Sequence, residues 1–186
     1  YARFLSNIMQ NDQMSQFDYM ATIFYIDKLS PVTIECLEKT GCCRILQDLY
    51  SRGLYDPANS MTLCRHASDI GNLELLQWAR NVGCPWDINV CSNAAKRGNV
   101  EMIEWARAQD PPCPWDPTVQ AHAVQHSLAM LKWTIANNAP GNMCIFSNAV
   151  AGNKLEILQW LLSNGYGFDA LTCRVATLGS HLDIIK

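Results

Sequence analysis

The side chains best suited to chemistry in this sequence are its cysteines and two closely spaced histidines. The cysteines are Cys36, Cys42, Cys43, Cys64, Cys84, Cys91, Cys113, Cys144 and Cys173. Their number is odd and no Cys-x-x-Cys pair occurs, so neither a disulfide framework nor a cysteine zinc site is indicated. His122 and His126 lie four residues apart on an expected helix and could supply half of a zinc site, but no further ligand pair is aimed at them. We therefore expect no metal, and we interpret the cysteines as reduced thiols used as small apolar side chains.

No catalytic motif accompanies these residues. The sequence has no dinucleotide-binding glycine motif, P-loop, nucleophile elbow or zinc-protease motif. Its 186 residues are 49% hydrophobic and 17% charged, with a net charge of −3, which argues against a disordered chain and against a basic nucleic-acid binder. No apolar run approaches the roughly 18 residues of a membrane span. We expect a non-enzyme with no cofactor, small-molecule substrate, nucleic-acid partner or membrane partner.

A repeated segment positions most of these residues. Gly71–Arg80 matches Gly98–Arg107 at six of ten positions, and further copies begin at His126, Asn153 and Ser180. Each complete copy carries one tryptophan, and these recur at intervals of 27, 28 and 27 residues: Trp78, Trp105, Trp133 and Trp160. Internal repeats with such a period indicate one supersecondary unit per copy.

Other columns follow the same period. Seven residues before each start lies an apolar residue: Cys64, Cys91, Val119, Phe146 and Cys173. Four residues before it lies a small residue, Ala67, Ala94, Ala149 or Ala176, except that His122 stands in the third copy. Turns such as Pro114-Trp115-Asp116 end in an aspartate that can cap the next helix. Each unit therefore predicts a turn, a first helix, a tight loop and a second helix. We expect the tryptophans to be core residues, each worth about 3–5 kcal/mol on truncation to alanine.

This pattern resembles the ankyrin repeat. Asn89–Gly98 stands where that family has its first helix, and Gly98-Asn99-Val100-Glu101 stands where it has Gly-His-x-Glu. The Cys-Pro-Trp-Asp turns resemble the divergent arrays of protists and large DNA viruses. The period is shorter than the family's usual ~33 residues, which predicts shortened hairpin turns. The resemblance implies an all-α fold, a helical-repeat solenoid of stacked antiparallel helix pairs.

The expected domain organisation has two parts. Residues 1–40 form an N-terminal helical lead-in or cap, with helices over Phe17–Leu29 and Val32–Lys39, and residues 41–186 form the array with its last repeat truncated. Four extra residues between Asp56 and Gly71 are expected to lengthen one first helix by a turn. Because the chain begins without Met and stops inside a copy, we interpret it as part of a longer protein.

The resemblance implies a protein partner bound at the concave face of the solenoid. The candidate contacts are the residues just before each copy and in the adjoining turns: Asp69, Ile70, Trp86, Asp87, Asn89, Lys96, Arg97, Trp115, Asp116, Val124 and Gln125. Trp86 and Trp115 have a second interpretation, packing between neighbouring turns, and Lys96-Arg97 can be a solvated helix end.

Two alternative functions stay open. The chain can be a structural subunit of a larger assembly, since a truncated solenoid exposes its last helices. It can also be the targeting arm of a longer protein, for example an F-box adaptor of a ubiquitin ligase, which Ile23–Ile26 and Leu29–Pro31 faintly resemble. Reduced cysteines predict an intracellular, reducing compartment, the cytoplasm or the nucleus.

Overall fold

The computed structural model describes residues 31–141 and 145–166. Over these ranges the chain forms ten α-helices, one short 3-10 helix and no strand. It divides into two compact units, the first ending at Pro85 and the second beginning at Trp86. The expected helix over Phe17–Leu29, the F-box-like segment and the fifth repeat copy lie outside the described residues.

From residue 31 onward, the first unit contains four α-helices and the 3-10 helix. They are α3 (Pro31–Thr40), α4 (Cys43–Ser51), η2 (Pro57–Asn59), α5 (Leu63–Ile70) and α6 (Leu73–Asn81). Helix α3 packs against both α4 and α5, and α5 packs against α6. The helix expected over Val32–Lys39 is therefore confirmed, and it belongs to the packed unit.

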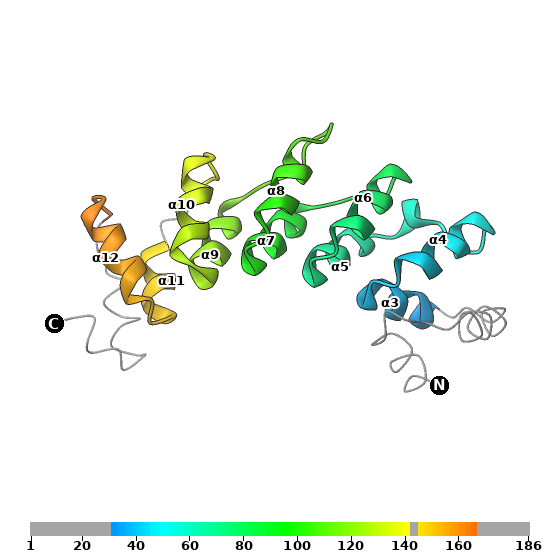
Figure 1. The fold of residues 1–186 in the computed structure, drawn as a ribbon, viewed down its shortest axis with the longest axis horizontal. Helices are drawn as coiled ribbons and strands as arrows, with labels where there is room; N and C mark the ends of the chain where they lie inside the picture. The colour runs from blue at the N-terminus through cyan, green and yellow to red at the C-terminus, as the bar shows by residue number, and fades with distance from the viewer. Residues whose placement is uncertain (1–30, 142–144, 167–186) are drawn as a thin grey trace. The chain divides into compact units, whose positions relative to one another are not determined.

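Over its described residues, 86–141 and 145–166, the second unit contains three helix pairs. They are α7 (Ile88–Arg97) with α8 (Val100–Arg107), α9 (Pro117–His126) with α10 (Leu128–Ala136), and α11 (Ile145–Ala151) with α12 (Leu155–Ser163). Within each pair the two helices pack together, and α9 also packs against α7 and α11 (Figure 1). Neighbouring first helices thus lie side by side, each carrying its own second helix.

Local capping explains where the helices begin. The carboxylates of Asp87 and Asp116 accept hydrogen bonds from backbone N–H groups two residues ahead, at 2.9 and 3.0 Å, which confirms the predicted caps. Three second helices, α6, α8 and α10, are capped by the side chains of Asn72, Asn99 and Ser127, which accept from the backbone N–H three residues ahead. Because these caps use residues close in sequence, the repeat pattern determines where these helices begin.

The buried columns are those expected from the repeat. Cys64, Cys91, Val119, Phe146, Ala67, Ala94 and Ala149 are all buried on the first helices. Each second helix buries a triplet with the same spacing: Leu75, Leu76 and Ala79; Met102, Ile103 and Ala106; Met130, Leu131 and Thr134; Ile157, Leu158 and Leu161. Fully burying a large aliphatic side chain contributes about 1.5–3 kcal/mol, so these columns hold the helix pairs together.

Two expectations about packing are wrong. The extra residues after Asp56 do not lengthen α5, because they form η2 and a connection in which the Ser60 hydroxyl accepts a hydrogen bond from the Leu63 N–H. The tryptophan column, exemplified by Trp105, is half-buried and lies at the edge of the core. Each tryptophan lies at the helix position directly before the last residue of the buried triplet. Its large indole therefore lies at the margin of the buried face, and part of the ring is exposed to solvent.

None of the described helices combines the length and the apolar character that crossing a membrane requires.

Candidate functional site

The predicted partner-binding residues differ in accessibility. Five are exposed: Asp69, Asp87, Lys96, Arg97 and Gln125. Five are half-buried: Ile70, Trp86, Asn89, Trp115 and Asp116. Val124 is fully buried. Asp69 and Ile70 belong to the first unit and the other nine to the second.

The turn residues Asp87, Asn89 and Asp116 are occupied by helix capping. One oxygen of Asp87 accepts the backbone N–H of Asn89 and the other accepts its side-chain amide at 2.7 Å. A single oxygen of Asp116 accepts both the backbone N–H and the hydroxyl of Thr118. These polar groups already have partners within the fold, so their first role is to start α7 and α9.

The turn tryptophans pack against the column tryptophans of the same helix pair. Trp86 and Trp105 have ring centroids 6.1 Å apart at an interplanar angle of 75°, and Trp115 and Trp133 have centroids 6.4 Å apart at 79°. Edge-to-face pairs of this kind are favourable. Trp86 and Trp115 therefore pack within the fold, but against the column tryptophan of their own helix pair and not between neighbouring turns as predicted. Part of each ring remains exposed to a partner.

Val124 is a correction to the predicted surface. Its side chain is 0% exposed, because α9 packs against α7, α10 and α11 and an apolar residue at this register turns inward. Lys96 stands at the same repeat position on α7 and is exposed, since a long amphipathic side chain can extend past its neighbours. Ile70 is half-buried, with its terminal methyl against Gly41.

Apart from the capping residue Asp87, the exposed predicted residues of the second unit lie at the ends of two helices. We call these residues the helix-end patch: Lys96, Arg97 and Gln125. Lys96 and Arg97 end α7, and Gln125 lies in the last turn of α9. These ends lie together, because the imidazole of His126 covers Gly98, the residue that terminates α7. The helix-end patch thus contains three of the five exposed residues of the predicted site.

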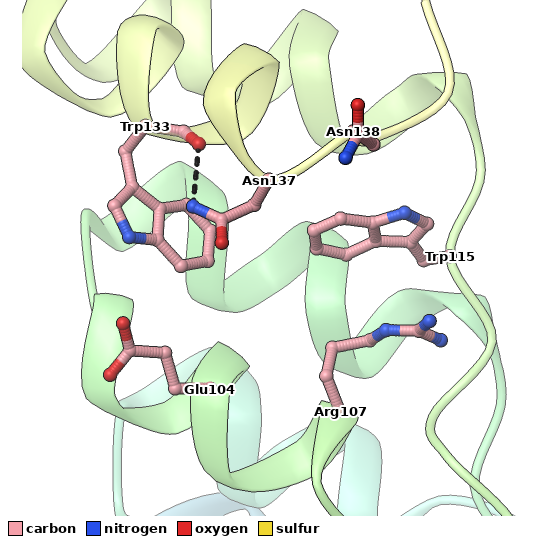
Figure 2. A pocket seen from close by; sticks show the side chains of 6 residues that line it. All are labelled: Glu104, Arg107, Trp115, Trp133, Asn137 and Asn138. Carbon is pink, nitrogen blue, oxygen red and sulfur yellow. Dashed lines mark hydrogen bonds between the residues drawn. The ribbon is translucent and has the colours of Figure 1, made fainter.

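A pocket that the sequence did not predict lies on the second helices. It encloses about 390 Å³ and is lined by residues of α8, α10 and the turns that follow each: Glu104, Arg107, Trp115, Trp133, Asn137 and Asn138. Figure 2 shows Trp115 and Trp133 on its two sides, with Asn137 between them, Glu104 below Trp133 and Arg107 below Trp115. We call it the tryptophan pocket.

The two charged residues of the tryptophan pocket differ in how they are held. The guanidinium of Arg107 lies 5.0 Å from the ring centroid of Trp115 and donates a 2.7 Å hydrogen bond to the Cys113 carbonyl. None of the ion pairs found among the described residues includes Glu104. The pocket therefore combines two indole faces, a fixed cation at one end and a carboxylate at the other.

The buried thiols form hydrogen bonds within the fold, and a hydrogen bond with a neighbouring thiol lowers the pKa of Cys84 and of Cys113. In the second unit, the hydrogen bond with the Cys113 thiol and burial raise the pKa of Cys91, whose side chain is 0% exposed. The Cys113 thiol also donates to the Asp87 carbonyl at 3.5 Å, and Cys84 does the same to the Ser60 carbonyl at 3.4 Å. A buried thiol with a raised pKa stays protonated and is a poor nucleophile.

Potential metal ligands do not gather over residues 31–141 and 145–166, where no group of three His, Cys, Asp or Glu side chains could hold a metal ion. A buried carboxylate in the first unit, Glu38, accepts hydrogen bonds from the hydroxyls of Tyr55, Ser60 and Thr62. Because Glu38 is 3% exposed, this cluster has no room for a substrate.

The sequence contained a partial signal for the tryptophan pocket. The Pro-Trp-Asp turn and the tryptophan column are both visible in the repeat, but the pocket also needs Glu104 and Arg107 from α8 in the preceding helix pair. Searches for relatives add no assignment, since no model of a known protein family matches the chain and no curated protein matches it either.

Proposed function

We propose that this chain is a non-catalytic protein-interaction scaffold, an ankyrin-like solenoid of helix pairs that holds a partner protein on its concave face. The observation that supports the proposal is that the contacts within the fold recur from copy to copy, whereas the exposed side chains differ between copies. Repeat proteins use this division, because conserved contacts between neighbouring units build the array and the exposed positions provide recognition.

The fixed framework recurs in detail. Arg80 donates a 2.7 Å hydrogen bond to the Cys84 carbonyl, and Arg107 donates one of the same length to the Cys113 carbonyl. The aspartate caps recur with the same spacing, and the edge-to-face aromatic pairs recur with nearly the same spacing. Equivalent contacts in successive copies favour a regular array over an accidental similarity of helices.

The exposed positions change from copy to copy. At the ends of the first helices the chain presents Asp69 in one copy, Lys96 with Arg97 in the next and Gln125 in the third. An acidic, a basic and a neutral end suit recognition of a particular partner surface better than they suit contacts between identical units. Arginine is also among the residues most enriched at the energetic centres of protein interfaces.

Affinity capture from native lysate tests the proposal. The chain is compared with a Lys96→Glu/Arg97→Glu/Gln125→Ala variant, which alters only the helix-end patch. A matched Lys39→Glu/Arg44→Glu variant reverses two exposed charges on α3 and α4. We expect a partner that the unaltered chain and the matched variant retain and the patch variant loses. A partner retained equally by all three would place the contact elsewhere and favour the assembly-subunit alternative.

A further inference from the structure

In two places in the second unit, the residue before a column tryptophan lies near the tryptophan of the next helix pair. Lys132 precedes Trp133, and its ammonium lies 5.4 Å from the ring centroid of Trp160 on α12. Glu104 precedes Trp105 at the same repeat position, and it lines the tryptophan pocket together with Trp133 on α10. Successive helix pairs of the second unit therefore differ in the charge beside the tryptophan of the following pair, which is negative at Trp133 and positive at Trp160.

Within the part of the chain that the structure describes, the cation–π contacts involve Trp115 and Trp160 and none involves Trp133. The face of an indole attracts a cation through its quadrupole, and Lys132 supplies that cation to Trp160. Beside Trp133 the chain places a carboxylate, so the ring face and the charge of Glu104 both favour a positive group. The nearest cation of the pocket lining, Arg107, is held over Trp115 and hydrogen-bonded to the Cys113 carbonyl.

The pocket also offers a neutral acceptor. The side-chain amide of Asn137 donates a 2.9 Å hydrogen bond to the Trp133 carbonyl, which leaves its own oxygen as an acceptor that points between the two indoles (Figure 2). An ammonium group carries three donors and no acceptor. A carboxylate, an amide oxygen and an indole face match that chemistry.

We propose that the tryptophan pocket binds a primary ammonium group, the side chain of a lysine that a partner protein presents. The assignment of the ammonium to a protein rests on the proposed scaffold function. The pocket's volume of about 390 Å³ is within the range of small-ligand sites and accommodates one extended lysine side chain. In effect, a partner's lysine occupies beside Trp133 the place that Lys132 occupies beside Trp160.

The probe for this proposal is the blocked tripeptide Ac-Ala-Lys-Ala-NH2, with Ac-Ala-norleucine-Ala-NH2 as the uncharged control. Binding to the 186-residue chain is followed by the indole N–H signals of Trp115 and Trp133 in NMR spectra. We expect the lysine peptide to shift these signals and to bind at least about fivefold more tightly than the norleucine peptide, the size of a modest cation–π contribution. Equal binding of the two peptides would overturn the proposal.

A charge reversal gives the sharper test. Glu104→Lys places an ammonium group of the chain itself beside Trp133. We therefore expect this variant to bind the lysine peptide at least tenfold more weakly, while its NMR spectrum remains that of a folded protein. Glu101→Lys makes the same charge change on the same helix at an exposed position outside the pocket lining, and it should bind within about twofold of the unaltered chain. Unchanged binding by Glu104→Lys contradicts the proposal.

The two proposals fail separately. The helix-end patch variant leaves the pocket lining intact, so it should bind the lysine peptide normally while it loses the partner captured from lysate. A chain that captures a partner but gives no peptide-induced shifts refutes the lysine site alone. A chain that binds the peptide but captures no protein refutes the scaffold function and with it the assignment of the ammonium to a partner protein.

Discussion

The hydroxyl of Tyr55 donates a 2.7 Å hydrogen bond to Oε1 of Glu38, a carboxylate that is only 3% exposed. The Ser60 and Thr62 hydroxyls donate to the same carboxylate at 2.7 and 2.8 Å. Burial, together with this hydrogen bond to a charged acceptor, raises the pKa of Tyr55 far above its usual range. The phenol therefore remains a donor, and the cluster ties α3 to the segment that leads into α5.

The first prediction concerns this tie. Removing one donor with Tyr55→Phe should lower the free energy of unfolding by about 1.5–3 kcal/mol, the usual value for a hydrogen bond to a charged group. Urea denaturation followed by circular dichroism measures the loss. Glu35→Gln on the same helix is the control, because Glu35 is exposed and pairs only at the surface with Lys39, and it should change stability little. Equal losses in the two variants would contradict a structural role for the buried cluster.

The sequence predicted the elements that depend on local signals. The aspartate caps and the apolar and small-residue columns of the first helices follow from residues within one copy, and the structure confirms them over the residues that it describes. It did not predict the Glu38 cluster, whose partners lie 17 to 24 residues away and outside the clear copies. The tryptophan pocket was missed for a similar reason, since it requires side chains of two helix pairs to meet. The inward turn of Val124 depends on the three helices around α9.

A second prediction concerns the close approach of Gly98 to His126. Gly98 has a positive φ of 72°, and a Cβ there would collide with the imidazole of His126. Gly98→Ala should therefore lower the free energy of unfolding by about 2–4 kcal/mol, from the left-handed backbone and the steric clash together. Gly53→Ala isolates the backbone contribution, because Gly53 has φ 68° and open space around it; we expect about 1–2 kcal/mol. If thermal or urea unfolding gives the same loss of free energy of unfolding for Gly98→Ala and Gly53→Ala, the close approach of His126 does not contribute to the cost of the substitution.

A third prediction concerns the half-buried tryptophan column. Because part of its ring faces solvent, Trp105→Ala should lower the free energy of unfolding by about 2–3 kcal/mol, less than complete burial would imply. In a double-mutant cycle with Trp86→Ala, the edge-to-face contact should appear as a coupling of about 0.5–1.5 kcal/mol. Strictly additive losses in urea denaturation would show that the two rings do not stabilise each other.

The last prediction concerns the pH dependence of stability at His122, which stands where other copies carry alanine. Burial, followed by the nearby charge of Lys96, lowers the pKa of His122, while a hydrogen bond with the Ser92 backbone and the charge of Asp116 oppose the shift only in part. The unfolded chain therefore binds a proton at His122 more readily than the folded chain does. The stability associated with neutral His122 is fully present above the ordinary pKa of 6.5 and is lost as the pH falls through the lower folded value. We expect the melting temperature to fall more steeply between about pH 7.5 and pH 5 for the unaltered chain than for His122→Ala, since the carboxylates contribute equally to both. If the melting temperatures of the two proteins change in parallel with pH across this range, the lowered pKa of His122 is refuted.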